Sequence, residues 1–161
     1  MQDGKIRIAI ADRHDNFREA CKRILDQEGD MELVSESGTG IGLSPLLDLM
    51  KADVLIFDDR IWEAEGLDSF RTIRQQFPKL KILCLVSEDG SDGLEAVQLG
   101  VNGVMEKGRN AAYLPKAIRK IVDGELWISR KLTSALMQTE LQRTLPRREP
   151  TVLWMESPEL G

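Results

Sequence analysis

The chain has 161 residues, 42% of them hydrophobic and 30% charged, a composition that suits a globular protein with one ordinary domain and a short extra segment. The formal net charge of −5 argues against binding nucleic acid or an anionic membrane through bulk electrostatics. No apolar run reaches the roughly 18 residues of a membrane span, and the first residues lack the apolar core of a signal peptide. We therefore expect a cytoplasmic protein that contacts proteins or small molecules and no membrane.

Short runs of apolar and β-branched residues predict five strands, separated by longer amphipathic stretches. The runs are Ile6 to Ala11, Met31 to Ser35, Val54 to Phe57, Lys81 to Val86 and Gly103 to Met105. Strands that alternate with helices are joined by parallel crossovers. The sequence therefore predicts an α/β fold, a (βα)5 doubly wound five-stranded parallel sheet, whose ligand site lies beyond the carboxyl ends of the strands.

The stretches between the strands predict helices with one buried face. The clearest three-and-four spacing occurs in two sets of apolar residues: Phe17, Ala20, Cys21, Ile24 and Leu25, and then Leu114, Ala117, Ile118, Ile121 and Val122. Another helix is expected after Ser44-Pro45, and two more should end at Pro78 and Gly100. Beyond Gly124, apolar residues at helical spacing predict an additional C-terminal helix that runs to about Arg143.

The cysteines, the histidine and a glycine-rich loop are interpreted structurally. Cys21 and Cys84 stand among apolar neighbours, which predicts buried free thiols. His14 is the only histidine, so a His-based metal cluster cannot form, and we expect it at a helix start near the strand ends. The segment Gly38 to Gly42 superficially resembles a dinucleotide-binding loop. Because Leu43 stands where the last glycine would be, we interpret the segment as a flexible loop.

Acidic residues stand where two predicted strands end. Asp12 follows the first strand, and Asp58, with Asp59 and Arg60 behind it, follows the third. The carboxyl ends of parallel strands meet at one edge of a sheet, so Asp12 and Asp58 are expected to lie close together. By strand alternation, Asp59 should point away from Asp58.

With Gly66 and Lys107 added in order, these landmarks give the segment from residue 5 to residue 124 a resemblance to the receiver domain of NarL/LuxR-type response regulators, which have the CheY-like fold. The tail adds a second resemblance, to the opening of a LuxR-type helix-turn-helix, at Leu145, Arg148, Glu149, Val152 and Leu153. We therefore expect a receiver at 5–124, an extra helix or linker at 125–143 and the truncated start of a helix-turn-helix at 144–161.

The resemblance implies that Asp58 stands at the position that accepts a phosphoryl group from a histidine kinase, and that Lys107 reaches that group. Receivers also hold Mg²⁺ with an acidic pair at the first strand end, but here the pair is Asp12-Arg13. Val86 replaces the hydroxyl residue that contacts the phosphoryl group, and Val104 replaces the aromatic that changes rotamer on activation. Asp59 and Trp62 are further departures in the loop after the third strand.

These departures favour a regulatory domain, not an enzyme, that is released from ordinary Mg²⁺-dependent phosphorylation and acts through dimerisation or partner binding. We expect no cofactor, and expect Asp58 to be paired with a basic side chain; an inward-facing Arg13 could supply the fixed charge in place of a metal. The resemblance implies a homodimer, a histidine kinase or other regulatory protein as partner, and DNA contact only through a helix-turn-helix missing from this chain.

Two alternatives stay open. In the first, Asp58 is a working phosphoacceptor, and Asp12, Asp58 and the Arg60 carbonyl hold Mg²⁺. In the second, Trp127 and Arg130 bind cyclic-di-GMP, because the segment around them resembles the stretch that binds this nucleotide in some LuxR-type regulators.

Overall fold

The computed structural model describes residues 4–61, 67–87 and 93–144, without the side chains of Leu67, Arg109 and Asn110. The chain divides into two compact units, Met1–Ser129 and Arg130–Gly161. The first unit contains β1 (Ile6–Ala11), α1 (Asp15–Asp26), β2 (Met31–Ser37), α2 (Leu43–Met50), β3 (Val54–Asp58), α4 (Leu67–Gln76), β4 (Lys81–Val86), α5 (Leu94–Gln98), β5 (Gly103–Glu106), the 3₁₀ helix η1 (Arg109–Tyr113) and α6 (Leu114–Val122).

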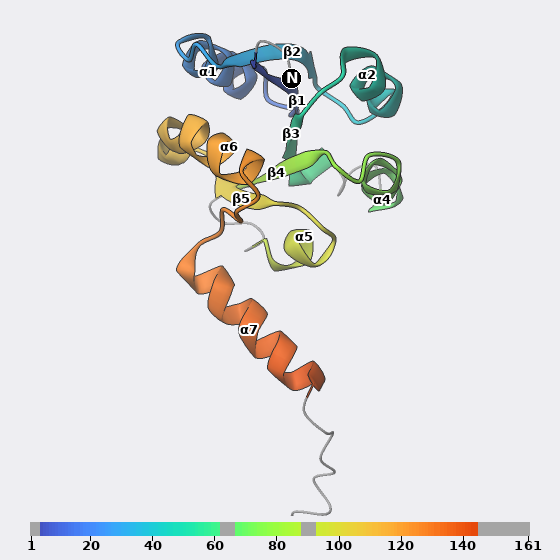
Figure 1. Cartoon of the computed structure of the whole chain (residues 1–161), viewed down its shortest axis with the longest axis vertical. Helices are drawn as coiled ribbons and strands as arrows, with labels where there is room; N and C mark the ends of the chain where they lie inside the picture. Colours follow the sequence, from blue (N-terminus) through green and yellow to red (C-terminus); the bar gives the residue numbers. More distant parts are fainter. Residues whose placement is uncertain (1–3, 62–66, 88–92, 145–161) are drawn as a thin grey trace, which may run out of the picture. The chain divides into compact units, whose positions relative to one another are not determined.

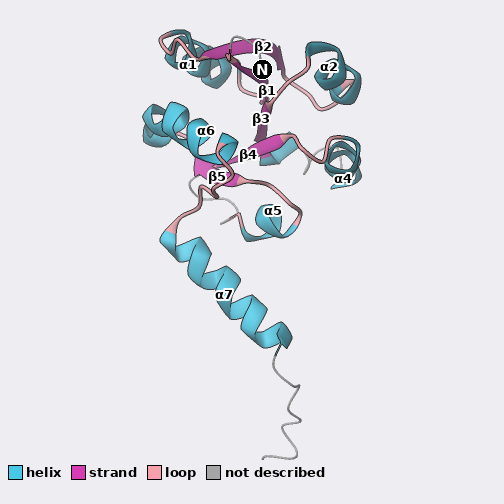
Figure 2. Ribbon diagram, viewed as in Figure 1, coloured by secondary structure: helices cyan, strands magenta, loops and turns pink. Residues whose placement is uncertain are grey.

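The strands form one parallel sheet in the order β2-β1-β3-β4-β5. Helices α1 and α6 cover one face, and α2, α4 and α5 cover the other (Figure 1, Figure 2). From β1 the chain first passes to β2 at one edge of the sheet. It then returns to β3 on the other side of β1 and continues outward through β4 to β5. This is the doubly wound arrangement that the sequence predicts, so the fold prediction is confirmed.

The core follows from the apolar content of the central strands. Every residue of β3 is buried, because helices cover both faces of the sheet. Between the sheet and α1 and α6, the strand residues pack against Cys21, Leu25, Ile118 and Ile121. On the opposite face the rings of Phe57 and Phe70 lie with their centroids 5.7 Å apart. The sheet is therefore fixed from both sides, which holds its carboxyl edge in place.

The predicted strands are all present, and three of them run further than expected. β2 continues to Ser37, because Asp12 donates its N–H to the Ser37 carbonyl at 2.9 Å. β3 includes Asp58 and β5 includes Glu106. Helix α2 begins at Leu43, so the Ser44-Pro45 pair lies inside its first turn, where proline is tolerated.

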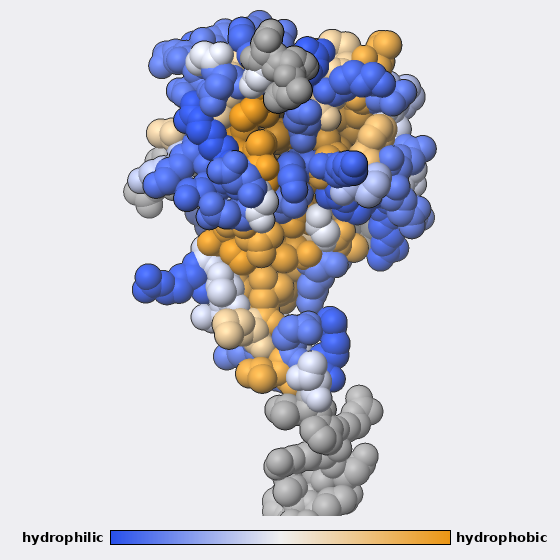
Figure 3. Space-filling view, viewed as in Figure 1, coloured by the Kyte–Doolittle hydropathy of each residue, from blue (hydrophilic) through white to orange (hydrophobic). Residues whose placement is uncertain are grey.

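The second unit contains the additional helix α7 (Arg130–Thr144), which matches the prediction to within a residue at its end. Met137 and Leu141 on this helix are exposed. Among the described residues, no helix is long and apolar enough to cross a membrane. On the face that Figure 3 shows, hydrophilic residues cover much of the first unit, and hydrophobic residues also gather on it.

Candidate functional site at the carboxyl edge of the sheet

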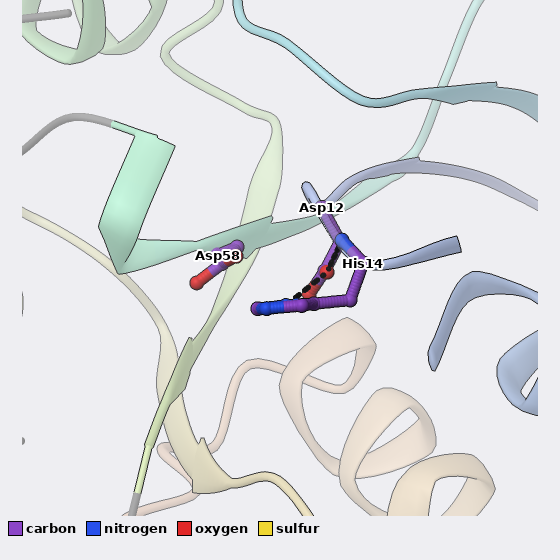
Figure 4. A group of neighbouring side chains, drawn as sticks. All are labelled: Asp12, His14 and Asp58. Carbon is purple, nitrogen blue, oxygen red and sulfur yellow. Dashed lines mark hydrogen bonds and ion pairs between the residues drawn. The ribbon is translucent and has the colours of Figure 1, made fainter. Parts of the chain in front are cut away.

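Two adjacent strands deliver the acidic residues of the site. β1 and β3 pair in parallel, with Ala11 opposite Phe57. The next residue of each strand, Asp12 and Asp58, therefore lies at the same edge of the sheet. Asp12 is 0% exposed and Asp58 is 1% exposed. Figure 4 shows both carboxylates, with the His14 ring between the β1 end and Asp58, converging on one space. The predicted proximity of Asp12 and Asp58 is confirmed.

Lys107 supplies the positive charge between these carboxylates. Its backbone N–H donates to the Val86 carbonyl at 3.0 Å, which fixes the residue at the end of β5. Its Nζ lies 2.7 Å from Asp12 Oδ2 and 3.2 Å from Asp58 Oδ2. The same ammonium lies 4.9 Å from the centre of the Phe17 ring, a cation–π contact. The expectation that Asp58 is paired with a basic side chain is met by this lysine.

His14 stands at the N-cap of α1, as predicted, and contacts both charges. Its backbone N–H donates to Asp12 Oδ1 at 2.7 Å. Its Nδ1 lies 3.1 Å from Lys107 Nζ. The same Nδ1 lies 3.5 Å from Asp12 Oδ1, so the ring stands beside both partners of the ion pair.

Arg13 does not enter the site. It is exposed, and it forms no ion pair with another side chain in the parts of the chain that the structure describes. The hypothesis of an inward-facing Arg13 that takes the place of a metal is therefore wrong. Beyond the end of β1 the chain turns into α1, so Asp12 is directed inward and its neighbour outward.

Arg18 is an arginine of the site that the sequence reasoning missed. From the second turn of α1 its guanidinium donates to the Asp12 carbonyl and to Asp15, and its Nε donates to Glu36 at 3.1 Å. The side chain therefore ties the β1 end to α1 and β2. The spacing of Asp15 and Arg18 on one helix face was the available signal.

The segments that directly follow β3 and β4 meet beside Asp58. The Arg60 N–H donates to Asp58 Oδ1 at 3.1 Å, and the Arg60 Nη2 donates to Ser87 Oγ at 3.2 Å. Val86 is buried and carries no hydroxyl, as the sequence predicts. Ser87, one residue later, is a second residue that the sequence reasoning missed, because its hydroxyl lies beyond the strand end.

Val104 fills its position as a packing residue. A Cβ placed on Gly93 would lie 2.6 Å from Val104 Cγ1, and the Gly93 φ of +87° also favours glycine. The backbone at the start of α5 thus lies directly against this valine. Because residue 104 is a valine, it has no aromatic ring that could change rotamer on activation.

Burial makes both cysteines poor nucleophiles. Cys21 and Cys84 are buried free thiols, as predicted. Burial, reinforced by the charge of Asp12, raises the pKa of Cys21 to about 12. Burial, with Asp59 and Asp58 nearby, also raises the pKa of Cys84 well above its usual value. Asp59 is itself buried at 3% exposure, beside Asp58 in sequence.

Two carboxylates and one imidazole form the group of candidate metal ligands at this edge. Candidate ligand atoms of Asp12, His14 and Asp58 all lie within 4.8 Å of one another. Mg²⁺ favours oxygen ligands in octahedral geometry, whereas one of these donors is an imidazole nitrogen. Both carboxylates already contact the Lys107 ammonium. Arg13, at the remaining position of the acidic pair, is exposed and cannot ligate a metal.

The residues of the cyclic-di-GMP alternative fall in different units. Trp127 packs against the core of the first unit, its N–H donates to the Asn102 carbonyl at 3.1 Å, and its carbonyl accepts from the Val104 N–H at 2.8 Å. Arg130 is the first residue of the second unit. Trp127 thus extends the pairing of β5. Trp62, Gly66 and the helix-turn-helix motif at residues 145–153 lie outside the described residues.

Comparisons with known proteins agree with this geometry. Residues 8–119 match the family described as response regulator receiver domain. The chain is 30% identical over 162 residues to the transcriptional regulatory protein DegU of Brevibacillus brevis, covering 100% of this chain and 66% of that protein. It is 32% identical over 134 residues to the oxygen regulatory protein NreC of Staphylococcus aureus strain JH9, covering 82% and 62%. The chain thus spans just under two thirds of these relatives.

Solved structures support the same fold. The isolated receiver domain of RcsB from Salmonella enterica serovar Typhimurium, in its apo form, superposes with a TM-score of 0.71 at 23% identity, covering 83% of this chain and 99% of that one. A LuxR-family two-component response regulator from Aurantimonas sp. gives a TM-score of 0.72 at 24% identity, covering 85% and 99%. The chain therefore belongs to the response regulator receiver family and carries a receiver domain of the NarL/LuxR type.

Proposed function

We propose that this receiver regulates transcription through protein contacts, in the cytoplasm, without conventional Mg²⁺-dependent phosphorylation of Asp58. The observation that carries the proposal is the position of Lys107, whose ammonium contacts Asp12 and Asp58 at 2.7 and 3.2 Å. Two buried carboxylates share one cation that belongs to the protein itself. A divalent ion would have to displace that cation and would find no further acid at position 13.

The charge of the site supports the same proposal. Phosphoryl transfer concentrates negative charge on the transferred oxygens, and an extra positive charge is needed to stabilise it. Lys107 is already committed to two carboxylates, and the side chain of Arg60 donates to Ser87. Val86 adds no hydroxyl donor. We infer that the ground state of the site is stabilised more than a phosphorylated state would be.

The output of the proposed regulator is a protein contact. We propose a homodimer, with other regulatory proteins as further partners, on the basis of the family to which the chain belongs. Contact with DNA is assigned to the part of the longer relatives that this chain does not match. Sedimentation velocity over a range of concentrations should give a monomer–dimer equilibrium, and a single monomeric species at high concentration would contradict the dimer.

Beryllofluoride binding tests the proposal about Asp58. Fluorine NMR in the presence of Mg²⁺ should show no bound beryllofluoride for the natural chain. The double variant Arg13→Asp/Val86→Thr, which restores the acid and the hydroxyl of the family pattern, should bind it measurably. A stable adduct on the natural chain, lost in Asp58→Asn, would favour the alternative of a working phosphoacceptor.

A further inference from the structure

A hollow opens at the amino edge of the sheet. Its lining comes from the residues that precede or begin β1, β3 and β4, together with the last residue of α6. Because these strands are parallel, their amino ends lie at the edge opposite to Asp12 and Asp58. The cavity volume is about 660 Å³. This size falls within the range of roughly 300–1,000 Å³ that is usual for small-ligand pockets.

We propose that this hollow binds a small organic anion, in which a carboxylate, sulfonate or phosphate group is attached to an apolar body. The basic side chains of the hollow, its apolar lining and its fixed backbone support this ligand class. None of the residues at the carboxyl edge contributes to the hollow. The site is therefore independent of the proposed function of Asp58.

The charge of the hollow favours an anion. Among the described residues that line it, Lys5, Arg7, Lys79 and Lys81 are basic, and Asp53 is acidic. The three lysines form no ion pair with another described residue. The chain as a whole has a net charge of −5, so this local excess of positive charge contrasts with the rest of the molecule. Such a concave basic surface raises the local concentration of anions.

Arg7 and Asp53 are already used by the fold. The Asp53 carboxylate accepts the Arg7 N–H at 2.9 Å, and the Arg7 carbonyl accepts the Asp53 N–H at 2.7 Å. The Arg7 side chain donates its Nε to the Met50 carbonyl at 2.9 Å, and its Nη1 lies 3.5 Å from Glu32 Oε1. The lysines are therefore the cations that remain available to a ligand.

The remaining lining is largely apolar. Its apolar residues are Ile6, Ala52, Phe77, Pro78, Leu80 and Val122. Val122 is 37% exposed, although Ile118 and Ile121 on the same helix are fully buried. An apolar body that covers Val122 would remove this surface from water, which favours binding. A simple inorganic anion would leave it exposed, and an uncharged apolar molecule would leave the lysines without a partner. The two features together favour an amphipathic anion.

Arg74 fixes one side of the hollow without lining it. Its Nη2 donates to three carbonyls of the turn between α4 and β4, at 2.8 Å to Phe77, 2.9 Å to Pro78 and 2.7 Å to Leu80. Its Nη1 donates to the Gly100 carbonyl at 3.1 Å. One guanidinium thus holds this turn in a single conformation. A preformed wall lowers the entropy cost of ordering the site when a ligand binds.

Fluorescence titration of the full chain with anilinonaphthalene sulfonate tests the proposal. This probe has an aromatic body and one sulfonate, and we expect saturable binding. Phenylnaphthylamine has the same aromatic body without the sulfonate. It should bind at least about tenfold more weakly, because it cannot pair with the lysines. Absence of saturable binding of the sulfonate, or equal affinity for the two probes, would overturn the proposal.

Variants of the hollow test which side chains bind the probe. Lys79→Gln/Lys81→Gln should weaken binding of the sulfonate by about tenfold, and Val122→Asp, which puts a negative charge into the apolar lining, by a similar factor. Lys22→Gln is the matched control, because Lys22 is an exposed lysine of α1 outside the hollow. Equal affinities of the control and the hollow variants would contradict the site. Circular dichroism checks folding, and Lys79→Gln alone, at an exposed position, replaces a double variant that does not fold.

Amide chemical shifts during the titration locate the probe. They should change at Lys5, Asp53 and Lys81 and stay constant at Lys107. Changes confined to the carboxyl edge would overturn the proposal. Binding of an acidic, phenylalanine-containing peptide without binding of the small probe would assign the hollow to a protein partner and would also overturn it. Neither outcome affects the proposed function, which depends on the beryllofluoride adduct at Asp58.

Discussion

Among the described residues, two clusters that each pair one cation with two carboxylates lie in opposite surroundings. At the carboxyl edge of the sheet, Lys107 lies between Asp12 and Asp58, with side-chain exposures of 15%, 0% and 1%. On the outer surface, Arg119 of α6 lies between Glu28 and Asp30, with exposures of 44%, 27% and 47%. Each cluster has one cation and two carboxylates, and the main difference between them is burial.

Burial changes what each cluster can do. The surface cluster joins α6 to the turn before β2, and water already solvates its charges, so its contribution to the free energy of unfolding is small. The buried cluster cannot lose its cation without leaving two carboxylates unsolvated. We therefore expect the lysine to stabilise the fold as well as to occupy the site. This double role is why we expect the site to resist a metal.

The largest expected effect is that of removing the buried cation. Lys107→Met should lower the free energy of unfolding by ~3–5 kcal/mol, because two carboxylates are left buried and unpaired. Urea denaturation followed by circular dichroism measures the change. Lys120→Met serves as the control, because this lysine is exposed and its Nζ lies as far as 3.7 Å from Glu125 Oε1. A loss of similar size in the control would show that burial is not the cause.

The next effect is the coupling between Lys107 and Asp58. Asp58→Asn/Lys107→Met removes the lysine together with one of the two carboxylates that Lys107→Met alone would leave unpaired. Its free energy of unfolding should therefore exceed the value expected from adding the two single changes by ~1–3 kcal/mol. The same denaturation measurements on both single variants complete the cycle. Strict additivity would mean that the 3.2 Å contact contributes nothing.

A smaller loss is expected for the surface cluster. Arg119→Ala should cost ~1 kcal/mol or less, although its guanidinium contacts Asp30 through both Nε and Nη2. Half a molar NaCl should reduce the difference from the natural chain, while the effect of Lys107→Met should persist. A salt-insensitive loss from Arg119→Ala would contradict the distinction between the clusters.

The smallest effect is the acid dependence of the surface cluster. The hydrogen bond from Arg119 lowers the pKa of Asp30 below its ordinary value of 3.8. A carboxyl with a lowered folded-state pKa contributes stability above its unfolded pKa, and that contribution disappears as the pH falls through the folded value. The stability difference between the natural chain and Arg119→Ala should therefore shrink below about pH 4. Thermal unfolding between pH 3 and pH 6 tests this, and a constant difference would contradict it.

The sequence predicts the sheet and its acidic edge better than it predicts the direction of individual side chains at that edge. The strands and the faces of α1 and α6 follow from apolar periodicity, so the sheet and its acidic edge at Asp12 and Asp58 could be predicted. The direction of Arg13 could not, because strand alternation no longer applies once the chain turns into α1.

Long-range contacts set the other limit. His14 and Lys107 are 93 positions apart, and Arg60 and Ser87 are 27 apart. No local pattern specifies such pairs, and the resemblance to receivers directed attention to Val86 instead of the serine after it. The prediction of a paired Asp58 was right, but Lys107 is the partner that the structure identifies.

We propose that Lys107, as the cation of the site, prevents Mg²⁺-dependent phosphorylation of Asp58. The most direct test of this proposal is incubation of the natural chain with Mg²⁺ and acetyl phosphate, followed by intact-mass measurement under acidic conditions that preserve acyl phosphates. The account predicts the unmodified mass, and the same result without Mg²⁺. A stoichiometric increase by one phosphoryl group, dependent on Mg²⁺ and absent from Asp58→Asn, would contradict it.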